Sequence, residues 1–245
     1  MEYGNICFSN WWNEKKENSW FYKFAVSCNN NCNLKIHFYS VFGNPNIQLK
    51  KDDVNIFFSG ENLEPFDYSR ENANLYSVKL FQKRILAYGD YQTNRADLSI
   101  GFGNKNYANY IRFPLWITYM LEPDDNEETI IEKINAIDKV HNSFDTSGQA
   151  ALFAGHDDFG TRTEIYETLK QHMTIVCPGK FQHNTGDIWV KDKNQYLRDF
   201  KFNICAENVD ADGYVSEKIF DAFASGTIPI YIGAKMCPEP EIFNK

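Results

Sequence analysis

The sequence lacks any apolar run of the roughly 18–20 residues that a membrane-spanning helix requires. Its first residues contain neither the basic stretch nor the apolar stretch of a secretory signal, so we expect no leader peptide. Basic residues are also few, with 25 Lys and Arg against 33 Asp and Glu and a net charge of −8. A nucleic-acid partner or a polybasic membrane anchor would need a basic face, so neither is expected. We expect a cytoplasmic protein, or one peripheral to a membrane.

The cysteines and histidines lack the spacing of a metal site. Of the six cysteines only Cys28 and Cys32 lie close together, and no second pair accompanies them at zinc spacing. The five histidines are scattered along the chain. We therefore expect free thiols in a reducing compartment and no structural zinc.

The residues that are present indicate an α/β protein. The 245 residues are 43% hydrophobic, enough to bury a core, and short apolar segments alternate with segments of helical spacing. Strands are expected at residues 6–8, 34–39, 54–60, 98–102, 111–116, 151–154, 173–176, 202–205 and 227–231. Helices are expected at residues 16–25, 129–140, 162–172, 196–200 and 216–224. Strands that alternate with helices in this way favour parallel sheets.

A shift in composition divides the chain. Residues 121–128 are acidic, and a helical segment and a polar loop through Ser147 follow them. We place the domain boundary here, between residues 1–125 and residues 126–245. Two α/β domains with a cleft between them are the expected architecture.

One segment carries chemistry at recognisable spacing. A buried strand over 202–205 leads into Glu207-Asn208, and Ser216 is positioned to cap a helix whose first turn holds Glu217 and Lys218. Ligands of open α/β sheets bind beyond the carboxyl ends of strands, where a helix N-terminus favours anions. Lys218 adds a full charge that suits a diphosphate, and Glu217 could accept hydrogen bonds from ribose hydroxyls. A capped helix with a solvated Glu and Lys explains the pattern equally well on physical grounds alone.

The order of several motifs along the chain is a more specific signal than the charged helix start alone. Glu207-Asn208, Tyr214, Glu217-Lys218 and the sequence Thr-Ile-Pro-Ile-Tyr-Ile-Gly at 227–233 resemble the donor-binding signature of the α1,3-fucosyltransferase family, glycosyltransferase family 10, and of its bacterial members in particular. Asn10-Trp11-Trp12 and Gly60-Glu61-Asn62 resemble motifs that come earlier in that family. The resemblance implies a GT-B-like fold of two Rossmann-like domains.

The resemblance also implies a reaction, the inverting transfer of L-fucose from GDP-fucose to a hydroxyl of a glycan acceptor, the 3-OH of GlcNAc or Glc. It implies that Glu61 is the general base. It assigns donor binding to Arg162, Asn208, Tyr214, Glu217 and Lys218. No metal and no cofactor are implied, because the charges of Lys218 and Arg162 suffice to stabilise a diphosphate leaving group.

The chain departs from the family at several places. Residues 153–158 replace a hydrophobic run that ends in Ser-Asn, Ala206 and Ile232 stand where aromatics are usual, and the segment between Glu61 and Leu98 is long. Family members also continue past the position of Lys245 with another strand and further helices, so the resemblance implies an incomplete C-terminal domain. Two alternatives therefore stay open, a GT-B transferase for another nucleotide sugar and a truncated, inactive chain that binds nucleotide or glycan.

Two further features of the sequence could be interpreted as functional sites. Asp210-Ala211-Asp212 has the Asp-x-Asp form that binds a divalent metal in GT-A glycosyltransferases, but a solvated loop is the expectation. Cys205 is expected to be a core residue, since no base lies near it in sequence.

Overall fold

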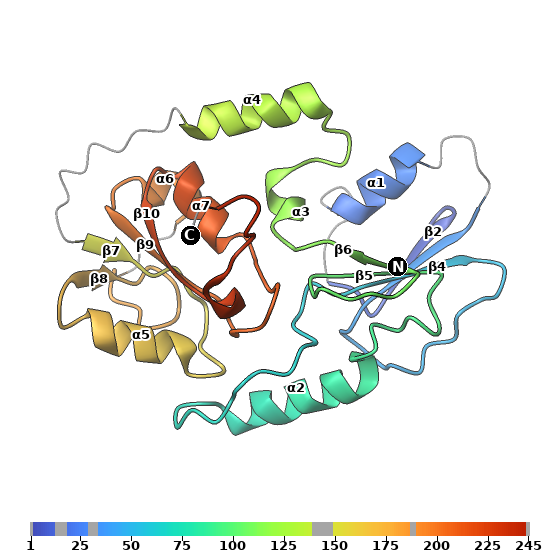
Figure 1. The fold of residues 1–245 in the computed structure, drawn as a ribbon, viewed down its shortest axis with the longest axis horizontal. Helices are drawn as coiled ribbons and strands as arrows, with labels where there is room; N and C mark the ends of the chain where they lie inside the picture. Colours follow the sequence, from blue (N-terminus) through green and yellow to red (C-terminus); the bar gives the residue numbers. More distant parts are fainter. Residues whose placement is uncertain (1, 13–18, 29–33, 139–148, 187–189, 244–245) are drawn as a thin grey trace. The chain divides into compact units, whose positions relative to one another are not determined.

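A computed structural model describes residues 2–12, 19–28, 34–138, 149–186 and 190–243 (Figure 1). The chain divides into two compact units. Unit 1 contains Met1–Pro65 and Phe81–Asn126, and unit 2 contains Phe66–Leu80 and Glu127–Lys245. The expected domain boundary between residues 125 and 126 stays a prediction. In the structure, the segment Phe66–Leu80 belongs to the same compact unit as the residues after 126.

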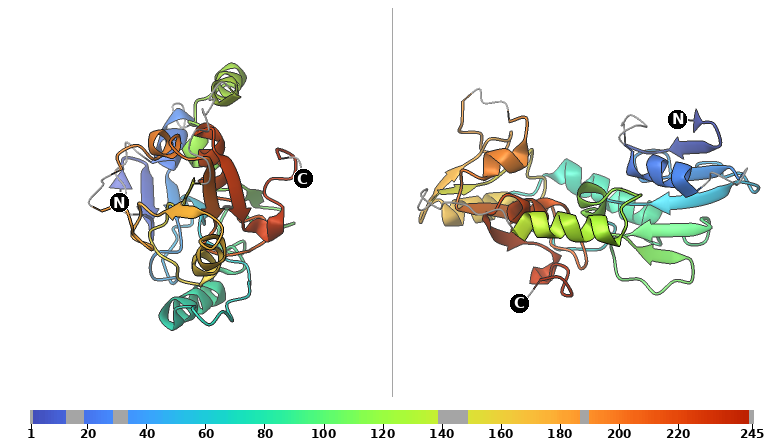
Figure 2. Two further views of the ribbon diagram at one scale, coloured as in Figure 1. Left: turned by 90° about the vertical axis from the view of Figure 1, so that its left-hand side faces the viewer. Right: turned by 90° about the horizontal axis from the view of Figure 1, so that it is seen from above.

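Unit 1 is built on a six-stranded sheet of order β1-β2-β3-β4-β5-β6, in which only the pair β1 and β2 is antiparallel (Figure 1, Figure 2). The strands are β1 (Glu2–Tyr3), β2 (Ile6–Ser9), β3 (Ile36–Tyr39), β4 (Val54–Phe58), β5 (Leu98–Gly101) and β6 (Tyr110–Arg112). The helices are α1 (Trp20–Cys28), α3 (Ile117–Met120) and, from Phe81 onward, the second part of α2 (Leu75–Tyr88). Aromatic side chains from β2, β3, β4 and α1 fill one core of this unit.

Unit 2 is built on a parallel four-stranded sheet of order β10-β9-β7-β8. The strands are β7 (Gln149–Ala151), β8 (Thr174–Val176), β9 (Phe202–Ala206) and β10 (Ile228–Ile232). The helices are α4 (Glu127–Asp138), α5 (Thr161–Leu169), α6 (Lys193–Leu197) and α7 (Lys218–Ala224), with a 3-10 helix η2 (Ala234–Met236). The predicted α/β class with parallel sheets is confirmed.

Several predicted bounds were wrong. The strand expected to run to residue 116 ends at Arg112, because Pro114 has no N–H for a ladder and residues 114–117 turn instead. The strand expected at 151–154 lies at Gln149–Ala151. The start of the helix expected at 16–25, the loop through Ser147 and Cys32 lie outside the described residues.

Helix α2 was not predicted from the sequence. Asn74 caps it, since its Oδ1 accepts hydrogen bonds from the backbone N–H groups of Tyr76 and Ser77 at 3.0 and 3.1 Å. Val78, Phe81 and Tyr88 are buried at helical spacing along it. A capping Asn before an apolar pattern is therefore the signal that could have identified this helix.

The start of α2 is tied to unit 2. The backbone N–H of Asn74 donates to the carbonyl of Asp158 at 2.8 Å, and Arg70 pairs with Glu164 at 2.9 Å. Phe66 packs edge-on against Phe159. These contacts explain why the segment before Phe81 groups with residues that are far away in sequence.

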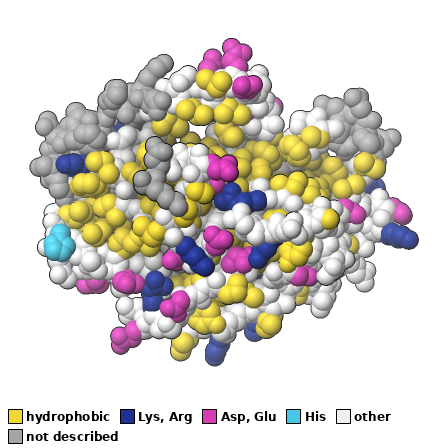
Figure 3. Space-filling view, viewed as in Figure 1, with side chains coloured by type: hydrophobic (Ala, Val, Ile, Leu, Met, Phe, Trp, Pro, Cys, Tyr) yellow, Lys and Arg dark blue, Asp and Glu magenta, His cyan; other side chains and the backbone are white. Residues whose placement is uncertain are grey.

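No helix among the described residues is long and apolar enough to cross a bilayer. On the face drawn in Figure 3, acidic and basic side chains are interspersed, with no single basic patch. Cys205 is buried, as expected for a core residue, and burial raises the pKa of its thiol.

Replacing Asn74 by Ala is expected to lower the free energy of unfolding by about 1 kcal/mol, because two N–H groups of α2 lose their acceptor. Urea unfolding followed by circular dichroism measures the change. Ser77→Ala, within the same helix, is the control and is expected to leave stability unchanged or slightly raised. Equal stabilities for the two variants would contradict the assignment of the cap.

Candidate functional site

A cluster of buried polar side chains lies beyond the carboxyl end of β9. Its centre is the carboxylate of Glu207, which is fully buried. Glu207 accepts hydrogen bonds from the backbone N–H of Ser216 at 2.8 Å, from the Ser216 hydroxyl at 2.7 Å and from the Lys218 ammonium at 3.0 Å. Its own backbone N–H donates to the carbonyl of Ile232. Glu207 therefore ties together the end of β9, the end of β10 and the start of α7.

The Lys218 ammonium is held in a charged environment. It donates to the Ser216 hydroxyl at 2.7 Å, and it lies 3.7 Å from Glu217 Oε1. Burial opposes its charge, but the carboxylates of Glu207 and Glu217 outweigh this and raise the pKa of Lys218 above its ordinary value. The side chain keeps 16% of its surface exposed. Lys218 thus remains a cation that a ligand can reach.

Glu217 is held ionised in the same cluster. Burial would raise the pKa of its carboxyl group, but the charges of Lys218 and Lys193 lower it below its ordinary value. The carboxylate is therefore able to accept hydrogen bonds at neutral pH, as the sequence-based assignment of Glu217 requires.

The prediction that Ser216 caps α7 was wrong. The helix begins at Lys218 after Glu217, and its start has no side-chain cap. The Ser216 hydroxyl donates to Glu207 instead. A buried carboxylate is costly unless donors satisfy it, so it takes the hydroxyl that would otherwise cap the helix. Gly226, expected to end α7, follows its last residues with a φ of 70°.

Arg162 is the second cation of the cluster. It lies in the first turn of α5 and is only 4% exposed, which excludes the alternative of a solvated first-turn residue. Its Nε donates to the carbonyl of Ala206 at 3.4 Å and its Nη1 donates to the carbonyl of His156. Burial lowers its pKa, while Asp157, Glu207 and Glu217 act in the opposite direction. The structure therefore brings Arg162, Glu217 and Lys218 into one neighbourhood.

Asp157 positions the turn that carries Arg162. Its Oδ1 accepts from the backbone N–H of Arg162 at 3.2 Å, and its Oδ2 accepts from the N–H and hydroxyl of Thr163 at 2.7 and 2.6 Å. The carboxylate at the start of α5 also suits the helix dipole. The unusual sequence before Arg162 thus supplies an acceptor for two N–H groups in the first turn of α5, whose N-cap residue is Gly160.

The loop after β9 adds polar groups. The Asn208 Oδ1 and the Tyr231 hydroxyl are both buried, and neither has a hydrogen-bond partner among the described residues. Buried polar atoms without partners are uncommon in proteins, which marks both atoms as unusual features of this loop. Tyr214 is 7% exposed and follows Gly213, whose φ of 71° suits glycine. Tyr231 lies in the motif at 227–233, but sequence reasoning did not single it out.

Close packing against Glu207 and Tyr231 requires glycine at position 233. A Cβ added there would lie 2.6 Å from Glu207 Cγ and 3.1 Å from the Tyr231 hydroxyl, and the residue has a φ of 145°. Any larger residue would displace Glu207 from its donors. The last glycine of the motif is therefore a packing residue for the charged cluster.

Asp210 has a structural role. Its Oδ1 accepts a hydrogen bond from the backbone N–H of Lys235 at 2.6 Å, which holds η2 against the loop. No group of three or more His, Cys, Asp or Glu residues in the described ranges could hold a metal ion. The absence of a metal requirement stays a prediction.

Glu61 lies in unit 1, in a turn that follows β4. The Ser59 hydroxyl accepts from the Glu61 N–H at 3.2 Å and donates to the Glu61 carbonyl at 2.9 Å, which fixes the backbone of the turn. Glu61 Oε2 accepts from Arg84 Nη1 at 3.1 Å, and Oε1 has no hydrogen-bond partner among the described residues. The side chain is 33% exposed. One carboxylate oxygen is therefore held while the other is available.

The sequence analysis did not identify Arg84 as a partner of Glu61. It lies on α2, 23 residues from Glu61 in sequence, and its guanidinium lies over the Phe42 ring. No sequence pattern links Arg84 to Glu61, because only the packing of α2 brings the two side chains together. Asn62, the last residue of the predicted motif, is buried, and its side chain bonds both backbone groups of Glu64, so its role is structural.

Two family models match the chain. Residues 6–119 match the alpha-(1,3)-fucosyltransferase FucT N-terminal domain. Residues 148–239 match the glycosyltransferase family 10 (fucosyltransferase) C-terminal domain.

Curated relatives agree with these models. An alpha-(1,3)-fucosyltransferase FucT of Helicobacter pylori is 27% identical over 94% of this chain and 50% of the relative, so the chain spans half the length of that protein. An alpha-(1,4)-fucosyltransferase of Arabidopsis thaliana is 38% identical over 32% of this chain and 20% of the relative.

Solved structures share the fold. A crystal structure of an α1,3-fucosyltransferase with GDP-fucose superposes with a TM-score of 0.58 at 24% identity, covering 95% of this chain and 69% of that one. A structure of an α1,3-fucosyltransferase with GDP gives 0.57 at 22% identity, covering 95% and 68%. The predicted GT-B fold is confirmed. Because its two parts match the two family models in the expected order, the chain belongs to the fucosyltransferases of glycosyltransferase family 10.

Proposed function

We propose that the protein transfers L-fucose from GDP-fucose to a hydroxyl of a glycan acceptor, the 3-OH of GlcNAc or Glc, with inversion at the anomeric carbon. The observation that carries this proposal is the pair of cations Arg162 and Lys218, held beside Glu217 beyond the carboxyl end of β9. In open α/β sheets this is where phosphorylated ligands bind. The direct test is the formation of fucosylated product from GDP-fucose and a glycan acceptor.

The two cations suit the leaving group of this reaction. As the bond between C1 of fucose and the β-phosphate oxygen breaks, negative charge grows on the departing GDP. Lys218 and Arg162 can stabilise that charge through charged hydrogen bonds, and the partly buried site strengthens the effect. Asn208, Tyr214 and Glu217 complete the proposed donor site, with the ionised Glu217 as acceptor for the ribose hydroxyls.

Glu61 suits the role of base. The acceptor oxygen attacks C1 while its proton passes to a carboxylate, and the displaced GDP keeps the electrons of the broken bond. Oε1 of Glu61 is open to receive that proton, and Arg84 holds Oε2 so that the group is oriented. The fixed turn at Ser59 limits the motion of the backbone that carries it.

Lys218→Ala is expected to weaken GDP binding at least about tenfold, because a charged hydrogen bond to phosphate is worth roughly 1.5–3 kcal/mol. Isothermal titration calorimetry measures the affinity, and Lys201→Ala is the control that should leave it unchanged. UDP and CDP titrated in the same way test whether another nucleotide sugar is the donor.

Lys218→Ala also leaves the buried Glu207 without its counter-ion, so loss of folding must be separated from loss of binding. The double variant Glu207→Gln/Lys218→Ala removes that unpaired charge. It is expected to regain thermal stability relative to Lys218→Ala without regaining GDP affinity. If the double variant regained both thermal stability and GDP affinity, the assignment of Lys218 to the donor site would be contradicted.

Transfer is expected to survive chelation, since the two cations do the work of a metal ion. Product formation with and without excess EDTA measures this. Complete loss of turnover that manganese restores would favour the Asp210 and Asp212 alternative.

Glu61→Gln is expected to lower turnover at saturating substrates at least about a hundredfold while GDP affinity stays near normal, because the amide cannot take the proton. Glu122→Gln is the matched control, an acidic residue of the same unit that also pairs with a cation, Lys23. Glu64 is unsuitable because it binds both Tyr91 and Lys105. Near-normal turnover in Glu61→Gln would place the base elsewhere.

A further inference from the structure

A second ion pair lies next to the charged site of unit 2. Lys193, the first residue of α6, donates its ammonium to Asp221 Oδ2 on α7 at 2.6 Å. The same ammonium lies 5.7 Å from the centroid of the Phe153 ring, in the segment that follows β7. The side chain of Lys193 is 28% exposed and that of Asp221 is 13% exposed. Lys193 therefore connects α6, α7 and the segment after β7 (Figure 1).

Asp221 lies one helical turn after Glu217. The backbone N–H of Asp221 donates to the carbonyl of Glu217 at 2.8 Å, so the two side chains project from the same side of the turn. Carboxylates at this spacing repel each other, and burial strengthens the repulsion. The nearest cation to Glu217, Lys218, also pairs with Glu207. One ammonium thus serves two carboxylates, and the carboxylate of Asp221 needs a cation of its own.

Lys193 supplies that cation. Burial opposes the charge of Glu217, and the charges of Lys218 and then of Lys193 overcome it and lower the pKa of Glu217. Burial raises the pKa of Asp221, and Lys193 acts against this effect. Without Lys193, Asp221 and Glu217 would compete for Lys218, the cation that the donor phosphates require.

The ion pair is not needed merely to hold the two helices together. Asn194 Oδ1 on α6 already accepts a hydrogen bond from the Ser225 hydroxyl, directly after α7, at 3.4 Å. A well-packed apolar pair often holds two elements as firmly as a buried ion pair, because charges lose their hydration on burial. A cation at position 193 is required only because a charge must be balanced there.

We propose that Lys193 is a positioning residue of the donor site, which neutralises Asp221 and so keeps the Glu217 carboxylate free for the ribose hydroxyls of the nucleotide. The inference rests on the proposed function, in which Glu217 accepts those hydroxyls. Lys193 acts through Asp221 and Glu217 and not on the nucleotide itself. It therefore governs the recognition of the ribose and leaves the recognition of the base and the diphosphate unchanged.

The experiment compares GDP with 2′,3′-dideoxy-GDP, which lacks the two ribose hydroxyls, by isothermal titration calorimetry. The unaltered protein is expected to bind GDP about tenfold more tightly, the worth of a hydrogen bond to a charged group. Lys193→Gln removes the charge but keeps a donor for Asp221. It is expected to weaken GDP binding about three- to tenfold and to change the affinity for dideoxy-GDP less than about twofold. A purely structural role of Lys193 would weaken the binding of both ligands alike.

Two further variants isolate the charge. Lys193→Arg keeps the cation and should retain the preference for GDP. Lys193→Gln/Asp221→Asn removes both charges and is expected to bring the GDP affinity back to within about twofold of that of the unaltered protein, because the two residues are coupled.

Lys170→Gln is the matched control. Lys170 also pairs with a carboxylate, Glu167, at 2.6 Å, and it lies 5.4 Å from the centroid of an aromatic ring, Tyr166. It belongs to the same unit but is not part of the proposed donor site. Lys170→Gln should bind both ligands like the unaltered protein. Thermal unfolding of each variant checks that the fold is kept.

The outcomes separate this inference from the proposed function. Equal losses of affinity for GDP and dideoxy-GDP in Lys193→Gln would overturn the positioning role, even if fucose transfer is observed. A double variant that binds GDP as weakly as Lys193→Gln would overturn it too, because Lys193 would then act on the nucleotide directly. A ribose-dependent loss that the double variant restores supports the role, including in a protein that forms no fucosylated product, in which case only the proposed transfer fails.

Discussion

The buried carboxylate of Glu207 is the constraint on which the charged site depends. A carboxylate removed from water must be satisfied by donors, and here Ser216 and Lys218 supply three hydrogen bonds to it. This requirement takes the Ser216 hydroxyl away from helix capping and fixes the position of the Lys218 ammonium. It also requires glycine at position 233, where a side chain would displace Glu207. The cation proposed to bind the donor is thus placed by a carboxylate that does not itself face a ligand.

The environment of Glu61 is the opposite of the environment of Glu207. It follows a parallel strand, as Glu207 does, but its side chain is a third exposed and only one of its oxygens is held, by Arg84, among the residues that the structure describes. A fully buried carboxylate such as that of Glu207 can orient a neighbouring side chain, here Lys218, but it cannot exchange protons with a substrate. An open carboxylate on a rigid turn can do so, and the Ser59 hydroxyl fixes the backbone of the turn that carries Glu61.

Much of this organisation was predictable from local sequence. The apolar strands that lead into Glu61 and Glu207, the order of strands and helices, and the motif from Glu207 to Gly233 are contiguous patterns whose meaning does not depend on distant residues. The errors have specific causes. Helix α2 was missed because exposed apolar residues such as Leu75, Leu80 and Leu86 obscure the spacing of the residues that α2 buries. Ser216 was assigned to a cap because its nearest competitor, Glu207, is nine residues away in sequence.

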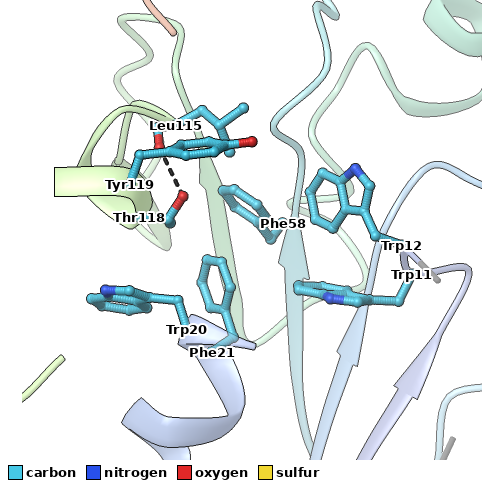
Figure 4. A pocket seen from close by; sticks show the side chains of 8 residues that line it. All are labelled: Trp11, Trp12, Trp20, Phe21, Phe58, Leu115, Thr118 and Tyr119. Carbon is cyan, nitrogen blue, oxygen red and sulfur yellow. Dashed lines mark hydrogen bonds between the residues drawn. The ribbon is translucent and has the colours of Figure 1, made fainter. Parts of the chain in front are cut away.

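The sequence by itself determined the α/β class, the family signature and the identity of the charged residues, since these depend on residue type and spacing. Only the tertiary structure decided which partner each charge has. Arg84 reaches Glu61, Asp157 accepts a hydrogen bond from the backbone N–H of Arg162, and three tryptophans with Tyr119 line one pocket (Figure 4). These pairings join residues from different elements, and burial determines their strength. The cost of leaving a polar group unsatisfied inside the protein depends on the packing around it, which local sequence does not specify.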